Sequence, residues 1–163
     1  MNDENFRQVA QALLEKQQSL STQLLEQLKQ EYKILSTQAA DSLHNITLNK
    51  QTLVAELNEL NQHWLALLST YCNSINPNNI AAFLLKYDDT HATSLLERWE
   101  ALQTTAGECQ KANTINGKII TLRFQAAQQT IAILRGQMPG DTTYDPHGNN
   151  TTAYVASNAL AKA

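Results

Sequence analysis

The chain has 163 residues, 42% of them hydrophobic, with five Gly, three Pro and a formal net charge of -3. This length suits one domain with its own core, and the acidic balance provides no basic surface for nucleic acid or an anionic membrane. So few helix breakers favour an all-α protein over a sandwich or barrel. No run approaches the roughly 18 apolar residues of a membrane span, and the N-terminal segment lacks a signal peptide's apolar stretch. We therefore expect a cytoplasmic protein without stable membrane insertion.

Residues 4–36 are predicted to form a long first helix. Apolar side chains recur there at steps of three and four residues, the spacing of an amphipathic helix. Polar Gln17 and Glu31 occupy two places on the same line. The apolar members of this first seam are Phe6, Val9, Leu13, Leu20, Leu24, Leu28 and Leu35.

A second helix is predicted over 41–74, with Ser36 or Asp41 available to cap its start. Lys50 is the polar exception on its seam, which otherwise consists of Leu43, Ile46, Leu53, Leu57, Leu60, Trp64, Leu67 and Tyr71. Pro77 then disfavours helix at the residue before it. A short helix over 79–87, capped by Asn78 or Asn79, is expected to cover one end of the bundle.

A third long helix is predicted over 91–135, with Asp89 or Thr90 as its cap. Taken alone, the Asn116-Gly117 pair would be a strong signal for a hairpin turn. The three- and four-residue steps nevertheless continue through it, so we assign the pair to the interior of the helix, where Gly117 costs about 1 kcal/mol relative to Ala. The seam comprises Leu95, Trp99, Leu102, Ala106, Cys109, Asn113, Asn116, Ile120, Phe124, Ala127, Ile131 and Leu134.

Two asparagines, Asn113 and Asn116, fall on this third seam. An Asn at a buried seam position lowers stability but fixes register, because its amide needs a polar partner across the interface. Gln17 and Lys50 on the other two seams are candidate partners, and the sequence does not assign the pairing.

Together these patterns predict an elongated antiparallel three-helix bundle over 1–136, with the short helix as an insert. The short connections favour antiparallel neighbours, and Gly136 stands where a helix C-cap glycine is usual. Residues 137–163 are rich in turn formers and poor in apolar side chains, so a flexible tail is expected.

Catalytic and cofactor motifs are lacking. The four His are scattered without the spacing of a zinc site, and no glycine loop could hold a phosphate. Cys72 and Cys109 are far apart and are interpreted as reduced, buried thiols. We expect no catalytic residue, metal or cofactor, and no enzymatic activity.

A second apolar line runs beside the third seam, about 100° around the helix. It could simply widen a face that packs against two neighbouring helices. The functional alternative is a surface that binds a partner's amphipathic helix. Its members are Ile115, Ile119, Leu122, Ala126 and Ile133.

The segment from Asn113 to Gly148 resembles the C-terminal signature of the FlgN family of flagellar type III export chaperones. In that family an Asn and an Asn-Gly pair lead an apolar helix that ends near Leu-Arg-Gly and is followed by a Tyr-containing turn. Those elements are Asn113, Asn116-Gly117, the run from Ile119-Ile120, Leu134-Arg135-Gly136, and the turn Thr143-Tyr144-Asp145-Pro146-His147-Gly148.

The resemblance implies a binding function without catalysis. Family members hold the terminal helices of the hook-filament junction proteins FlgK and FlgL, and contact the cytosolic domain of the flagellar export gate through a tail Tyr. Carried over, Tyr144 would contact the gate, and the second half of helix 91–135 would hold the client. Tyr154 is a second tail aromatic that could take this role. The alternative from another class is a structural coiled-coil scaffold or adaptor that buries the second apolar line in a homodimer.

Overall fold

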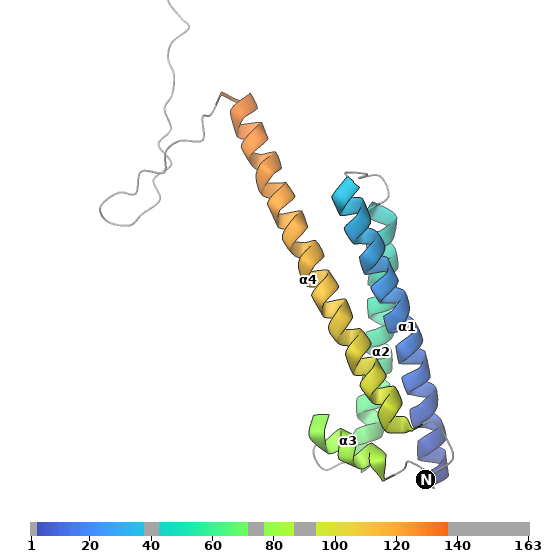
Figure 1. The fold of residues 1–163 in the computed structure, drawn as a ribbon. Coiled ribbons are helices and arrows are strands. Elements are labelled where there is room, and N and C mark those ends of the chain that lie inside the picture. Colours follow the sequence, from blue (N-terminus) through green and yellow to red (C-terminus); the bar gives the residue numbers. More distant parts are fainter. Residues whose placement is uncertain (1–2, 38–42, 72–76, 87–93, 137–163) are drawn as a thin grey trace, which may run out of the picture. The chain divides into compact units, whose positions relative to one another are not determined.

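The computed structural model describes residues 3–37, 43–71, 77–86 and 94–136. Over these ranges the protein is all-α, with four helices and no strand (Figure 1). The fold class predicted from the hydrophobic period is therefore confirmed. The helices are α1 (Asp3–Thr37), α2 (Leu43–Tyr71), α3 (Pro77–Leu85) and α4 (Leu95–Leu134).

The chain forms two compact units, residues 1–120 and 121–163. The first unit contains α1, α2, α3 and the first part of α4, and the second contains the rest of α4. The predicted boundary between a bundle over 1–136 and a tail over 137–163 stays a prediction, since the tail lies outside the described residues.

Two helix starts differ from the expected ones because the local chemistry offered several caps. α3 begins at Pro77 itself; proline suits the first helical position, where its missing N–H is no loss. At α4, the Ser94 hydroxyl accepts a hydrogen bond from the backbone N–H of Glu97 at 3.2 Å, and the helix begins at Leu95. Asp89 and Thr90 lie outside the described residues. The expected C-cap is present, because Gly136 has φ +71°.

Contacts along the first unit give the helix directions. Phe6 packs on Tyr71, with ring centroids 4.9 Å apart, and Glu31 binds Lys50 further along, so α1 and α2 run antiparallel (Figure 1). α4 runs parallel to α1, because its contacts advance together. Gln18 bonds Thr105 at 2.9 Å, and Leu28 bonds Asn116 at the same distance.

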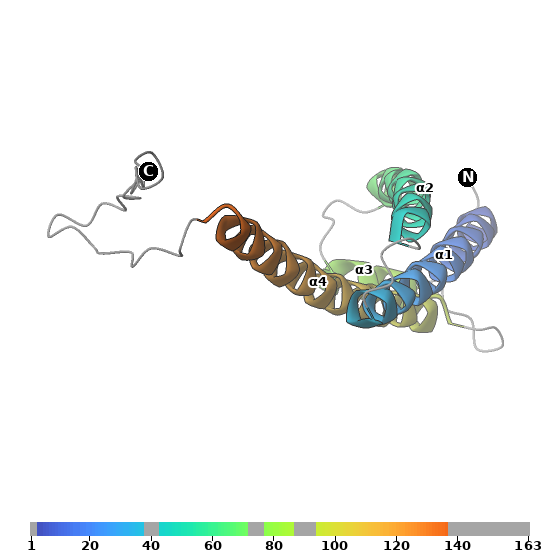
Figure 2. The ribbon, with the colours of Figure 1, turned by 90° about the horizontal axis from the view of Figure 1, so that it is seen from above.

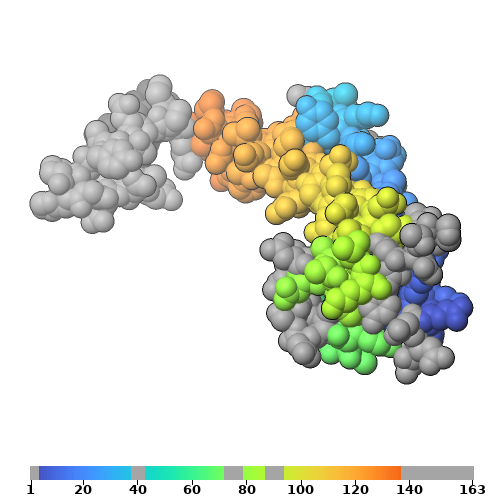
Figure 3. Space-filling model, turned by 60° about the horizontal axis from the view of Figure 1, so that its bottom comes forward, coloured from blue at the N-terminus to red at the C-terminus, as the bar shows by residue number. Residues whose placement is uncertain are grey.

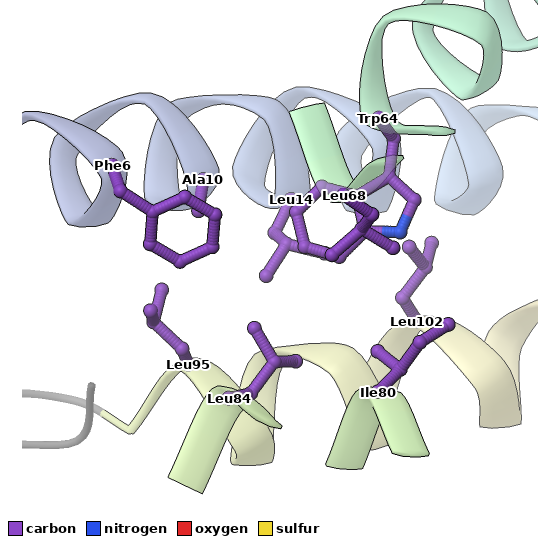
Figure 4. Packing of buried hydrophobic residues seen from close by; sticks show 9 residues of the cluster. All are labelled: Phe6, Ala10, Leu14, Trp64, Leu68, Ile80, Leu84, Leu95 and Leu102. Atoms are coloured by element: carbon purple, nitrogen blue, oxygen red, sulfur yellow. The ribbon is translucent and has the colours of Figure 1, made fainter. Parts of the chain in front are cut away.

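The main core lies where all four helices meet (Figure 4). α3 lies at this end of the unit, beside the first turns of α4 (Figures 2 and 3), and contributes buried Ile80 and Leu84. Trp64 of α2 stacks on Trp99 of α4, with ring centroids 5.7 Å apart. α3 thus covers one end of the bundle, as expected. The buried members of this core are Phe6, Ala10, Leu14, Trp64, Leu68, Ile80, Leu84, Leu95 and Leu102.

The buried line on α1 is wider than the predicted seam. Val9, Leu13 and Leu24 of that seam are only partly buried, because α1 packs against α2 on one side and α4 on the other. Burial therefore extends to the neighbouring line, which the seam omitted: Ala10, Leu14, Ser21 and Leu25.

Candidate functional site: an uncovered apolar face on α4

Burial along α4 follows a seven-residue repeat and ends at Asn116. Within the described part of α4, the buried side chains are Leu95, Leu102, Cys109 and Asn116. Partly buried residues fill the intervening steps, among them Thr105, Ala112 and Ile119. This is the spacing of a coiled-coil seam. Asn113 stands one position off this line and is exposed, so the prediction that it lies on the buried seam is wrong.

The predicted seam also fails after Asn116, where its apolar members are exposed. Beyond Asn116 the described part of α4 continues for about 27 Å and contains no buried side chain. The exposed seam residues are Ile120, Phe124 (63% exposed), Ala127, Ile131 and Leu134 (81% exposed).

The second apolar line predicted to bind clients is mostly exposed as well. Leu122 is 65% exposed, Ile115, Ala126 and Ile133 are also exposed, and Ile119 is partly buried. Large apolar side chains gathered on a surface usually mark an interaction site. Both apolar lines of this half of α4 are thus available to a partner, and this set of residues is called the α4 face below.

At the last buried position of α4, Asn116 joins three helices through a polar cluster. The Asn116 amide, 1% exposed, donates to the Leu28 carbonyl at 2.9 Å and to Glu31 Oε2 at 2.8 Å. Lys50 Nζ from α2 lies 2.8 Å from both Glu31 oxygens. These bonds determine the orientation of the amide, since Nδ2 faces two acceptors.

The cluster fixes the alignment of α1, α2 and α4 in the first unit. A buried carboxylate without a partner is costly, so only the register that brings Lys50 and Asn116 to Glu31 is stable. Of the two candidate partners, Lys50 belongs to the cluster and acts through Glu31. Gln17 is buried but does not bond Asn116 in the described structure; its Oε1 has no hydrogen-bond partner there. The sequence feature that could have identified the partner of Asn116 is Glu31, because it is a polar residue on the α1 seam.

Gly117 follows the cluster directly and is helical, as predicted. A Cβ built there would meet no atom within 4 Å. Packing inside the described structure therefore does not require glycine at this position.

Cys109 is a buried free thiol on the α4 seam. Its Sγ donates to the Ser21 carbonyl at 3.4 Å. Burial raises the pKa of this thiol, Glu108 raises it further, and Lys29 lowers it. The neutral thiol is thus the favoured form. Cys72 lies outside the described residues.

Among the described residues, no three His, Cys, Asp or Glu side chains form a group that could hold a metal ion. None of the described helices is long and apolar enough to cross a membrane. Tyr144 and Tyr154 lie outside the described residues, so their predicted role with the gate is not tested.

These observations define a helical-bundle protein whose described part carries the exposed apolar α4 face, which is suited to binding another apolar segment. The family model of the FlgN protein matches residues 1–152, nearly the whole chain, and the chain therefore belongs to the FlgN family. Membership makes it a flagellar export chaperone. Comparisons with curated proteins and with solved structures gave no match.

Proposed function

We propose that this protein works in the cytoplasm, where it binds amphipathic terminal helices of the hook-filament junction proteins FlgK and FlgL. It prevents their premature association and delivers them to the cytosolic domain of the flagellar export gate. The observation that carries this proposal is the α4 face, which is apolar and exposed in a member of an export-chaperone family.

Helix-in-groove binding accounts for the arrangement of this face. A partner helix buries its apolar stripe against residues spaced three and four apart, the spacing of Ile115, Ile119, Leu122 and Ala126. Leu122 and Phe124 together offer side chains of the size that dominates burial energetics at interfaces. The buried seam of α4 ends at Asn116, within the polar cluster, and the described residues after it are exposed or partly buried.

The tail has a separate role in this proposal. Tyr144 supplies the contact with the export gate, since a tyrosine combines a large apolar ring with a hydroxyl and is common among interface hot spots. Client binding and gate binding then belong to different segments of the chain.

The test uses size-exclusion chromatography with light scattering on the full-length protein, alone and mixed with a C-terminal fragment of FlgK from the same organism. We expect a one-to-one complex formed from a monomer. Leu122→Glu should abolish the complex and leave the fold intact, because Leu122 is exposed. Gln125→Glu is the matched control, since it adds the same charge at an exposed position about 140° around α4 from Ile120 and about 120° from Ile119, one residue of each apolar line. This variant should bind normally.

Other outcomes would overturn the proposal. Unchanged fragment affinity in Leu122→Glu would place the client elsewhere on the molecule. A stable homodimer that ignores the fragment and is dissociated by Leu122→Glu would assign the face to self-association, as in a coiled-coil scaffold.

A further inference from the structure

The charge of the second half of α4 differs in sign from that of the whole chain. Between Cys109 and Gly136 the sequence contains no Asp or Glu, whereas the full chain carries a net charge of -3. The cations in this stretch are Lys111, Lys118, Arg123 and Arg135. A segment that covers the α4 face therefore meets only positive charge from this helix.

One of these cations, Arg123, lies within the apolar surface itself. Residues three and four positions apart on a helix are surface neighbours, and those of Arg123 are all apolar: Ile119, Ile120, Ala126 and Ala127. The adjacent Leu122 and Phe124 are exposed apolar side chains, and Arg123 is partly buried. By contrast, Lys111 and Lys118 are exposed and lie on another side of the helix.

Arg123 also lacks a partner within the described ranges. No hydrogen bond or ion pair of its guanidinium occurs there, while Lys50 and Arg98 each bind a carboxylate. The nearest acidic residue earlier in α4 is Glu108, about four helical turns away. Until the face is covered, water can solvate this charge.

Covering the face changes the energetics of that charge. An apolar helix laid across these residues removes water from the guanidinium, and a buried charge without a partner is strongly destabilising. An occupant that binds tightly must therefore supply an acceptor at this point. A carboxylate fits best, because the planar guanidinium can bind both of its oxygens at once.

We infer that Arg123 is a specificity-determining residue, which binds an Asp or Glu placed within the apolar face of the client helix. This inference rests on the proposed function and adds to it the chemistry of the client. A client helix with a purely apolar face, or with a Lys or Arg at that place, is rejected.

The test measures binding of the same FlgK C-terminal fragment to the full-length protein by titration calorimetry. Arg123→Met removes the charge and keeps an unbranched apolar stem, and we expect it to weaken binding by about 10- to 100-fold. Lys118→Met is the matched control, since it removes one charge from an exposed position about 140° around the helix. It should change affinity less than about threefold. Urea unfolding midpoints should agree among the three proteins.

A charge exchange identifies the partner residue. Each Asp and Glu of the fragment is changed to Lys in turn, and one of these variants should lose binding to the wild type and regain it with Arg123→Glu. No rescue by any fragment variant would overturn the inference.

The remaining outcomes separate this inference from the proposed function. Fragment binding that Arg123→Met leaves unchanged would overturn the role of Arg123 and leave the proposed function standing. Failure of the wild type to bind the fragment would overturn the proposed function. Arg123-dependent binding to phosphatidylglycerol vesicles without fragment binding would assign the face to an anionic membrane surface, and overturn both.

Discussion

Asn116 of α4 donates a hydrogen bond to the Glu31 carboxylate of α1 at 2.8 Å, and the same carboxylate binds Lys50 of α2. Glu31 is 3% exposed, so its charge depends on these two partners rather than on water. One carboxylate thus links three helices at the last buried position of α4.

Replacing Glu31 should therefore destabilise the protein strongly. We expect Glu31→Ala to lower the free energy of unfolding by about 3 kcal/mol, because it leaves the Lys50 ammonium and the Asn116 amide without their acceptor. Asn116→Ala should cost roughly 1–3 kcal/mol. Urea denaturation of the two single variants and the double variant measures the coupling, and the double variant should lose less than the sum of the two.

An exposed acid on the same helix is the control for this cycle. Glu26 accepts a hydrogen bond from Gln30 on the exposed surface of α1, and Glu26→Ala should change stability by less than about 0.5 kcal/mol. Strictly additive losses in the Glu31 and Asn116 variants would contradict the coupling described here.

Gly117 offers a prediction of opposite sign. Gly117→Ala should raise the free energy of unfolding by about 1 kcal/mol, since the residue is helical and a Cβ there has open space. Gly136→Ala should instead lower it by about 1 kcal/mol, because Gly136 has a positive φ. Thermal unfolding compares the two variants. A loss of stability in Gly117→Ala would mean that glycine is required there by a contact not described above.

Cys109 should be protected from alkylation in the folded protein. Burial raises its pKa above the ordinary value of 9.0, and the thiolate is the reactive form. In a Cys72→Ser background, iodoacetamide should label Cys109 slowly in buffer and fast in urea. Equal rates would show that the thiol is accessible.

The same shift predicts a pH dependence of stability. The folded thiol keeps its proton at a pH where the unfolded thiol has lost it, so the contribution of Cys109 is present below about pH 9 and is lost as the pH rises through the folded pKa. Between pH 8 and pH 11 the free energy of unfolding should therefore fall more in the Cys72→Ser background than in the same background with Cys109→Ala. Parallel curves would exclude the effect.

Tyr144 allows the two binding roles to be separated. Under the proposed function, Tyr144→Ala should leave affinity for the FlgK fragment unchanged and reduce affinity for the cytosolic domain of the export gate by at least tenfold. Pull-down with each partner gives the comparison, and Tyr154→Ala identifies which tail aromatic acts. Loss of fragment binding in Tyr144→Ala would contradict a division of roles between α4 and the tail.

The three- and four-residue spacing of apolar side chains was enough to predict the helices and much of the core. Phe6 and Trp64 were placed on seams and are buried, and the unbroken phase correctly kept Asn116-Gly117 inside a helix. Local chemistry was less decisive at the helix starts, because Asn78, Asn79 and Pro77 could each begin α3.

The site was harder to predict because period shows which residues can be buried and not whether a neighbour is present to bury them. Ile120 and Phe124 fit the seam as well as Leu102 does, yet only Leu102 is buried. The difference depends on whether another helix packs against each residue, and no pattern within α4 contains that information. Arg123 was overlooked for a related reason, since its apolar neighbours matter only once that face is known to be uncovered.

The end of buried packing at Asn116 has a consequence for folding. In the described part of the chain after Asn116, no side chain is buried, so local backbone hydrogen bonds and the Gly136 cap supply most of the order of the last turns of α4. A helix of this length without tertiary support is marginal in water. These turns should therefore open at a much lower free energy than the bundle. A client that binds there must also order the helix, and this cost lowers its net affinity.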